Sequence, residues 1–483
     1  MAYSIAQEPN QLAAANSPMV FVLKESSSVI YNADKFRYIA QIFISTTNDS
    51  TWVETAKIKI HKNNSNVGIV DVHKIVRTYL ETQEDNIGDQ ETIDGSIHSI
   101  GISETSNSYS QNRGQLVGVK LVGGYEKASS ATAAPEENLA PETDAALYTR
   151  IIYSIPASTP YTDIGTNVGG LDIDGTNNPL TNYIPSSSTK KFLTNAPNIQ
   201  FIRGSSTAGD NVDELTVAFI NDGLITDGDY LGSIFLQYYD SSGNLINGTS
   251  GGTSFYAFAN TEANGGHADP ADDVRNSLLY FGCGTANLQN QTINSDARPS
   301  NHTNWAYYKI QGRNAAGSAI ETKAYYFYRY GSGAKVDDRH QSCTRYDNVR
   351  LAWRNRLGAW DYMNFRGKST ESVDITRSDM GSVPGTWDNL TFNYDTWDRG
   401  KKTLYTEATR KLTINSDWLN PDEGAWLEEL FTSTNVQILG DDNIVYPVIL
   451  TDKTYTKKTS VNNKIKIQYT IKLEYANKVR TNS

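Results

Sequence analysis

Cysteine, methionine and long apolar runs are scarce in this sequence. Its 483 residues include two cysteines, Cys283 and Cys343, and four methionines. Two thiols in so long a chain do not make a disulfide framework, and no second pair stands at zinc-binding spacing. No run approaches the roughly 20 apolar residues of a membrane-spanning helix. The sequence therefore predicts neither a disulfide scaffold nor membrane insertion.

The N-terminal stretch MAYSIAQEPNQLAAANSP lacks the basic start and the apolar core of a secretion signal. We therefore expect a protein that is made in a cytoplasm and reaches the outside by assembly or lysis. Basic residues are outnumbered by acidic ones: the chain has 43 Lys and Arg and 54 Asp and Glu, which gives a net charge of −11. Because nucleic acids are bound through Lys and Arg contacts to phosphates, a nucleic-acid partner is not expected.

Tyrosine (29) and glycine (36) are plentiful, together with Ser, Thr and Asn. This composition favours strands. Short apolar or alternating segments between Ser, Asn and Asp turns predict a mainly β chain of several antiparallel β-sandwich or barrel-like domains, each covered by one or a few short helices. The predicted parts are an N-terminal arm at 1–17, a β-rich domain at 18–128 with a helix at about 71–82, linker and insertion loops at 129–190, a middle β-rich region of one or two domains at 191–345, and a C-terminal β domain at 346–483 with a helix at about 420–432.

Three segments carry clear local signals. Asn420 is a candidate N-cap, followed by Pro421 and by Glu423 at the capping-box position. Near the other end of the chain, Asp71 is the expected N-cap of the first helix. Residues 464–476, KIKIQYTIKLEYA, alternate apolar with polar side chains and predict a strand with one buried and one solvated face.

The segment LAWRNRLGAWDYMNFRG, residues 351–367, gathers aromatic and arginine side chains. A two-residue turn centred on Gly358 and Ala359 predicts an amphipathic hairpin, with an Arg356–Asp361 pair across the strands. Its apolar face would hold Trp353, Leu357, Trp360 and Tyr362, and its polar face Arg354, Arg356 and Asp361. The alternative is a partner interface, since Trp, Tyr and Arg are the usual anchors, and its candidate residues are Trp353, Arg354, Arg356, Trp360 and Tyr362. A catalytic cluster is the least favoured interpretation.

Residues 386–400, TWDNLTFNYDTWDRG, repeat Thr-Trp-Asp. Either they form another hairpin that turns at NYDTW, or Trp387 and Trp397 stack on sugar rings while the acids bind hydroxyls. Both tryptophans are candidate interface residues. Asp172–Gly175 begins like a calcium loop, but Tyr183 stands where that loop needs an acid. The histidines are dispersed, and the chain has no HExxH, CxxC, GxSxG or phosphate-loop motif. We therefore expect no catalytic, cofactor or metal site, although one sequence cannot exclude a glycosidase pair among 54 acids.

Several of these segments together resemble structural proteins of tailed bacteriophages. The C-terminal resemblance rests on LAWRNRLGAWDYMNFRG, WLNPDEGAWLEELFTSTNVQIL, VYPVILTD and KIKIQYTIKLEYAN, and the N-terminal one on VGIVDVHKIVRTYLET. It covers the first ~90 and the last ~130 residues. It implies a virion component of the tail, the baseplate or the tail-to-fibre junction, which works as a symmetric ring or trimer without a cofactor.

The expected function is therefore non-enzymatic. The chain would assemble as a homo-oligomer with other virion proteins, and residues 1–17 and 127–190 would contact neighbouring subunits. The main alternative is a module that recognises host-surface glycans through exposed aromatics. A polysaccharide-degrading enzyme is a weaker third candidate.

Overall fold

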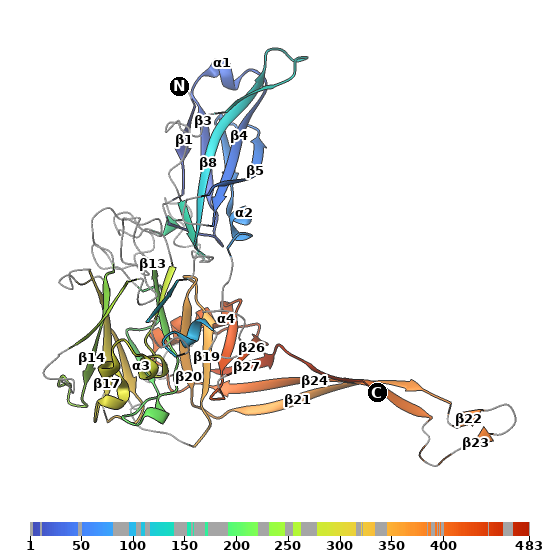
Figure 1. Cartoon of the computed structure of the whole chain (residues 1–483). Coiled ribbons are helices and arrows are strands. Elements are labelled where there is room, and N and C mark those ends of the chain that lie inside the picture. Colours follow the sequence, from blue (N-terminus) through green and yellow to red (C-terminus); the bar gives the residue numbers. More distant parts are fainter. Residues whose placement is uncertain are drawn as a thin grey trace. The chain divides into compact units, whose positions relative to one another are not determined.

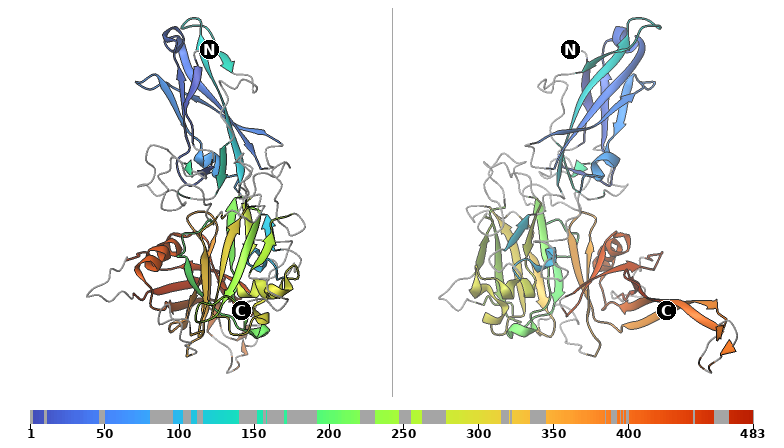
Figure 2. Two further views of the ribbon diagram at one scale, coloured as in Figure 1. Left: turned by 90° about the vertical axis from the view of Figure 1, so that its left-hand side faces the viewer. Right: turned by 45° about the vertical axis from the view of Figure 1, so that its right-hand side comes forward.

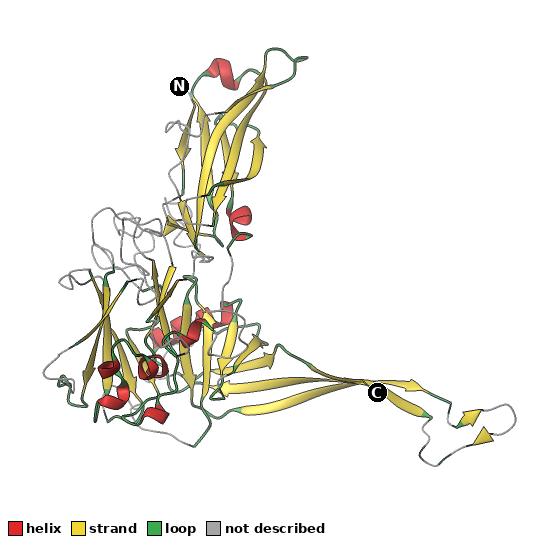
Figure 3. Ribbon diagram, in the orientation of Figure 1, coloured by secondary structure: helices red, strands yellow, loops and turns green. Residues whose placement is uncertain are grey.

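A computed structural model gives the structure of the protein. It describes residues 3–9, 12–46, 51–80, 96–102, 108–111, 116–139, 152–155, 158, 170–171, 192–220, 231–246, 255–261, 278–314, 320, 322–333, 345–383, 385–387, 392–393, 395, 397, 400–442, 444–456 and 467–482. Within these ranges the chain is mainly β, with several antiparallel sheets and four short α-helices, as the predicted fold class requires (Figure 3). None of the described helices is both long and apolar enough to cross a membrane.

The chain divides into two compact units. The first comprises Met1–Ser342 with Arg354–Asp361, and the second comprises Cys343–Trp353 with Tyr362–Ser483. The second unit therefore starts close to the predicted boundary at 346. The predicted domains at 18–128 and 191–345 both fall in the first unit.

Two sheets build the N-terminal part of the first unit (Figure 1). The smaller sheet has the order β1-β3-β6, with β1 (Tyr3–Gln7), β3 (Val20–Glu25) and β6 (Val67–Asp71). The larger has the order β11-β2-β10-β8-β4-β5, with β11 (Gly170–Leu171), β2 (Leu12–Ala14), β10 (Ile152–Ile155), β8 (Val117–Ala128), β4 (Asp34–Ser45) and β5 (Val53–Ile60), and β9 (Glu136–Leu139) pairs with β8. The short helices are α1 (Ser28–Tyr31) and α2 (His73–Arg77).

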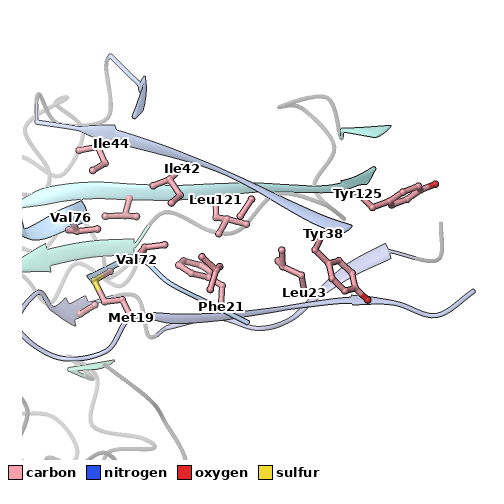
Figure 4. Close-up of a cluster of buried hydrophobic side chains, with 14 of the residues drawn as sticks. Met19, Phe21, Leu23, Tyr38, Ile42, Ile44, Val72, Val76, Leu121 and Tyr125 are labelled. Atoms are coloured by element: carbon pink, nitrogen blue, oxygen red, sulfur yellow. The ribbon is translucent and has the colours of Figure 1, made fainter. Parts of the chain in front are cut away.

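One hydrophobic core joins these two sheets (Figure 4). Phe21 and Leu23 of β3 pack in the same cluster as Ile42 of β4, Leu121 of β8 and Val76 of α2. Along β3 the buried residues alternate with half-buried or exposed ones, because successive side chains of a strand point to opposite faces. The alternating pattern of the sequence thus places one face of each sheet in the core.

The N-terminus and the first helix differ from the prediction. Residues 1–17 are predicted as an arm, yet β1 pairs with β3, β2 pairs with β10, and Tyr3 is buried. The helix predicted at 71–82 is only α2, with Val72 as its N-cap. Asp71 ends β6 instead, where its Oδ1 accepts a hydrogen bond from the His73 backbone N–H at 3.2 Å. Pairing with β3 holds Asp71 in the strand and delays the helix.

A two-sheet sandwich forms the middle of the first unit. One sheet has the order β12-β18-β17-β14-β15, with β12 (Ile199–Ile202), β18 (Tyr325–Arg329), β17 (Tyr307–Arg313), β14 (Ser233–Tyr239) and β15 (Tyr256–Ala259). The other has the order β13-β16-β7, with β13 (Thr216–Ile220), β16 (Leu278–Gly282) and β7 (Tyr109–Gln111). The short helices here are α3 (Thr285–Asn290), η2 (Ile97–Ser99), η5 (Ala208–Asp210), η7 (Ser295–Ala297) and η8 (Pro299–Asn301).

Aromatic side chains hold the two sheets of this sandwich together. Phe258 of β15 meets Phe281 of β16 edge-on at 5.3 Å, and the Tyr109 hydroxyl of β7 donates to the Phe258 carbonyl at 2.7 Å. Because β7 precedes residue 128, the predicted boundary there does not separate the sandwich from the N-terminal sequence. β17 and β18 pair antiparallel. Residues 262–277 lie outside the described residues, and β16 begins directly after them. Cys283 is buried, and Cys343 lies outside the described residues.

An eight-stranded sheet forms most of the second unit. Its order is β20-β19-β25-β26-β27-β24-β21, with β20 (Trp360–Phe365), β19 (Val349–Arg354), β25 (Val436–Leu439), β26 (Val445–Leu450), β27 (Thr470–Tyr475), β24 (Lys401–Asn415) and β21 (Thr370–Gly381), while β28 (Val479–Asn482) pairs with β24. A two-stranded sheet follows β21, with β22 (Thr386–Trp387) and β23 (Phe392–Asn393). β21 and β24 run on together well beyond the rest of their sheet (Figures 1 and 2).

The predicted C-terminal helix is confirmed as α4 (Pro421–Thr432). The Asn420 side chain accepts from the Glu423 backbone N–H at 2.8 Å, and Glu423 Oε2 accepts from the Asn420 backbone N–H at 2.9 Å, which is the reciprocal capping box. The predicted face of the last long strand is also confirmed, since Ile471 and Leu473 are buried and Lys472 is exposed. The strand itself is shorter, because β27 starts at Thr470 and residues 457–466 lie outside the described residues.

Candidate functional site

The aromatic and arginine-rich hairpin closes through a different turn from the predicted one. The Asn355 backbone N–H donates to the Ala359 carbonyl at 2.8 Å, and the Gly358 N–H donates to the Asn355 carbonyl at 3.1 Å. Asn355 therefore faces Ala359, and the loop has three residues rather than two. Gly358 has a φ of +85°, a conformation that a residue without Cβ adopts without strain.

This turn overturns the predicted Arg356–Asp361 pair. The Asn355 side chain is the physical reason, because its Oδ1 accepts from the backbone N–H groups of both Leu357 and Ala359 at 3.0 Å and fixes the longer loop. Asp361 Oδ1 instead accepts hydrogen bonds from Thr194 Oγ1 at 2.6 Å and from Asn355 Nδ2 at 3.0 Å.

The hairpin is also buried on both faces, not amphipathic. Trp353, Trp360, Tyr362 and Arg354 are buried, and Arg356 is half-buried. The prediction that these five residues contact a partner stays a prediction, but their own chain already covers most of their surface. An accessible interface has to be sought elsewhere.

Arg354 occupies an unusual environment. Its side chain is 6% exposed, and its guanidinium lies over the Trp360 ring, 5.7 Å from the centroid. Trp360 also meets the His98 ring edge-on at 4.9 Å. In the part of the chain that the structure describes, neither Nε nor either Nη of Arg354 has a hydrogen-bond partner. No acid accompanies this cation there, so the arrangement offers a buried positive charge rather than an acid–base pair.

Trp353 and Tyr362 belong to the second unit and serve its packing. The Trp353 ring lies 4.9 Å from the Trp426 ring of α4. Tyr362 lies under the Arg350 guanidinium at 5.5 Å. Both contacts fit the scaffold interpretation of the hairpin.

The second tryptophan-rich segment also turns at a different place. Trp387 of β22 pairs with Phe392 of β23, and Asn393 is itself a residue of β23, so NYDTW does not make the turn of this hairpin. Trp397 is 74% exposed. Its indole ring is therefore accessible to a ligand.

The most extensive accessible feature is a ribbon that the sequence prediction did not single out. We call β21, β24 and β28 the ribbon. In its register Ile375 stands opposite Ala408, and Ala408 stands opposite Val479, so the three side chains share one face. Val373 lies on the same face, and Val373, Ile375 and Val479 are 48%, 52% and 56% exposed. We call this face the apolar face of the ribbon.

The apolar face continues the core of the sheet. On β24 the same face carries Leu412 and Ile414, which are buried opposite Leu473 and Ile471 of β27. Moving along β24 from Ile414 towards Ala408, Arg410 interrupts the apolar side chains of this face, and the face passes from the buried Leu412 to the exposed Val373 and Ile375 of β21. The apolar face of the ribbon thus continues the core face of the sheet, and the described residues of this chain do not cover it.

The opposite face of the ribbon is polar and internally paired. Lys411 Nζ lies 2.5 Å from Asp374 Oδ2, and this hydrogen bond raises the pKa of Lys411 above its usual value. Lys478 pairs with Glu407 at 3.2 Å, and the Arg480 guanidinium lies 4.4 Å from the Tyr405 ring centroid. Water can solvate this polar face, whereas the exposed side chains of the apolar face would be stabilised by burial.

The calcium loop predicted at 172–175 lies outside the described residues. Among the described ones, no group of three or more His, Cys, Asp or Glu side chains is placed to hold a metal ion. The signal for the ribbon was present in the sequence, because Val373 and Ile375 alternate with Ser, Asp and Thr. That alternation predicts a half-buried strand but does not say what buries it.

No protein-family model matches the chain, and no curated protein matches it. Among solved structures, Salmonella alpha-2-macroglobulin reacted with methylamine is similar over 97% of this chain and 23% of that one, with 9% identity and a TM-score of 0.19. The native conformation of E. coli alpha-2-macroglobulin is similar over 86% of this chain and 21% of that one, with 8% identity and a TM-score of 0.17. The chain spans less than a quarter of these two neighbours, and likenesses this weak carry no argument.

Proposed function

We propose that this chain is a non-enzymatic structural component of a tailed-phage virion. Its place is in the tail, the baseplate or the tail-to-fibre junction, and it assembles there as a homo-oligomer with other virion proteins. The observation that carries the proposal is the apolar face of the ribbon, an exposed continuation of a sheet core. Exposed apolar surface of this kind marks interaction sites in soluble proteins.

The segments that resemble phage structural proteins support the same proposal. LAWRNRLGAWDYMNFRG supplies β19 and β20, WLNPDEGAWLEELF supplies α4, and the end of KIKIQYTIKLEYAN supplies β27. All three parts belong to the sheet, or to its helix, from which the ribbon extends. The C-terminal part of the resemblance and the exposed surface thus concern the same sheet and its helix.

The particle itself provides the test. Virions produced by the host that carries this gene are banded on a density gradient, and their proteins are quantified by mass spectrometry. We expect the chain in the band at a fixed number of copies per particle, and immunogold labelling at the tail. A chain that is abundant in the lysate but absent from intact particles contradicts the proposal.

The alternative function, recognition of host-surface glycans, is favoured by one observation, the exposure of Trp397. A free indole face can stack on a sugar ring. A glycan array probed with the full chain and with Trp397→Ala tests it, and Trp418→Ala is the matched control because Trp418 is also exposed, at 57%. Binding that Trp397→Ala abolishes and Trp418→Ala retains would favour this alternative, whereas equal signals from all three would exclude Trp397 as the contact.

A further inference from the structure

We propose that the apolar face of the ribbon binds a second copy of this chain. This inference rests on the proposed function and adds the surface through which the copies associate. The second copy would bury Val373, Ile375 and Val479, which are about half exposed in the single chain.

The first argument is the incomplete structure of the ribbon. β21 is the last strand of its sheet, and eleven of its twelve residues are exposed. Two- or three-stranded ribbons with an open apolar face are marginal in water, and natural proteins rarely leave a long edge strand unprotected. A partner that covers the apolar face supplies the missing layer.

The second argument is charge, and it selects the partner. The three strands of the ribbon hold six Lys or Arg and four Asp or Glu residues, an excess of two positive charges. The whole chain carries −11, so the remainder carries −13. A basic ribbon is therefore complementary to the acidic remainder of another copy, and such complementarity steers association.

The third argument is the position of the charges on the apolar face. Two arginines lie on the apolar face: Arg410 stands within it, opposite Val373, and Arg377 ends it at the next pair on that face beyond Ile375. Arg410 is held 3.9 Å from Glu371, and both side chains are largely exposed. Arg is enriched in protein interfaces, so arginines among exposed apolar side chains fit a partner-binding face. The two arginines also disfavour face-to-face contact between two ribbons, because like charges would meet, so the surface bound on the second copy is outside its ribbon.

The experiment compares Ile375→Lys with Thr376→Lys in the full-length chain. The two positions are adjacent and exposed, and they lie on opposite faces of β21. Both variants add the same charge, so they differ only in the face they alter. Sedimentation velocity over a range of concentrations measures the association, and circular dichroism checks the fold.

We expect a discrete oligomer for the wild type and for Thr376→Lys, and at least about tenfold weaker association for Ile375→Lys. A wild-type oligomer that neither variant weakens, or that both weaken equally, overturns the inference. A wild-type monomer at every concentration also overturns it, yet leaves the virion proposal intact, because only the particle composition decides that proposal.

A second readout identifies the occupant directly. A photoreactive benzoylphenylalanine at position 375 should yield an adduct of twice the chain mass in the purified protein, and the same group at position 376 should yield far less. If crosslinking in an infected-cell lysate gives only adducts with another protein, the occupant is not a second copy and the inference is wrong.

Discussion

Asn355 Nδ2 donates a 3.0 Å hydrogen bond to Asp361 Oδ1, and this contact fixes the turn of the aromatic hairpin. The same nitrogen donates to the Leu193 carbonyl at 2.8 Å, while Asn355 Oδ1 accepts from two backbone N–H groups of the turn. One buried amide therefore makes four hydrogen bonds. It links the turn to a strand residue and to a distant segment of the same unit.

Replacement of this side chain should be costly. Asn355→Ala leaves the half-buried Leu193 carbonyl and two buried N–H groups without their partner, so we expect a loss of about 2–4 kcal/mol in the free energy of unfolding. The control is Asn244→Ala, since Asn244 also bonds within a turn, to Asp240 Oδ2 at 3.0 Å, but is exposed. Its loss should stay below about 1 kcal/mol. Urea unfolding followed by tryptophan fluorescence measures both, and equal losses would contradict the role of burial.

The features that sequence predicts well here depend on neighbours in the chain. The capping box needs only Asn420 and Glu423, three residues apart, and it stands as predicted. The face of β27 follows from alternation alone. The turn of the aromatic hairpin could not be predicted, because Gly358 fits both a two-residue and a three-residue loop. The Asn355 side chain decides between them.

Burial of the same hairpin depends on contacts that alternation does not encode. Asp361 is held by Thr194, which lies 167 residues away in the chain. The ribbon shows the opposite difference between pattern and burial. Val373 and Ile375 have the alternating pattern of a half-buried strand, yet both are exposed among the described residues. Sequence alone gives the two faces of a strand, but tertiary structure decides which faces are covered.

The second prediction concerns the buried guanidinium of Arg354. Arg354→Met keeps the length of the side chain and removes a charge that has no hydrogen-bond partner among the described residues. We expect the free energy of unfolding to rise by about 1–3 kcal/mol, less the loss of the contact with Trp360. The exposed Arg77→Met is the control and should change stability by less than about 0.5 kcal/mol. Thermal unfolding measures both variants, and destabilisation by several kcal/mol would mean that Arg354 has an acceptor.

The third prediction concerns the capping box of α4. Asn420→Ala removes one of its two reciprocal hydrogen bonds and should cost about 1 kcal/mol. Glu423→Ala removes the other. Because each side chain bonds to the backbone of its partner, the double variant should lose less than the sum of the two single losses. Strictly additive losses, measured by urea unfolding, would show that the two bonds act independently.

The last prediction is a pH dependence centred on His302. The ring is buried, stacks on Tyr238 at 4.2 Å, meets Tyr256 at 5.5 Å, and places Nε2 3.1 Å from the Asp296 carbonyl oxygen. Nδ1 is buried and has no hydrogen-bond partner in the described ranges, so the neutral ring with a proton on Nε2 fits the site. Burial lowers the pKa of His302 below its usual value near 6.5, although the Asp296 carbonyl and the Asp296 charge oppose that shift.

The sign of the effect follows from which state binds the proton more readily. At a pH between the lowered pKa and 6.5, the unfolded chain protonates this histidine while the folded chain does not. His302 therefore costs stability as the pH falls through that window, and the cost levels off once the folded-state pKa is passed. His302→Gln can still donate to the Asp296 carbonyl but does not titrate, so the thermal midpoint of this variant should fall less between pH 7.5 and pH 5 than that of the wild type. His73→Gln is the control, because the His73 ring is partly exposed and lies beside Asp71 rather than in an aromatic core. Identical pH profiles for His302→Gln and the wild type would contradict a neutral buried histidine at this site.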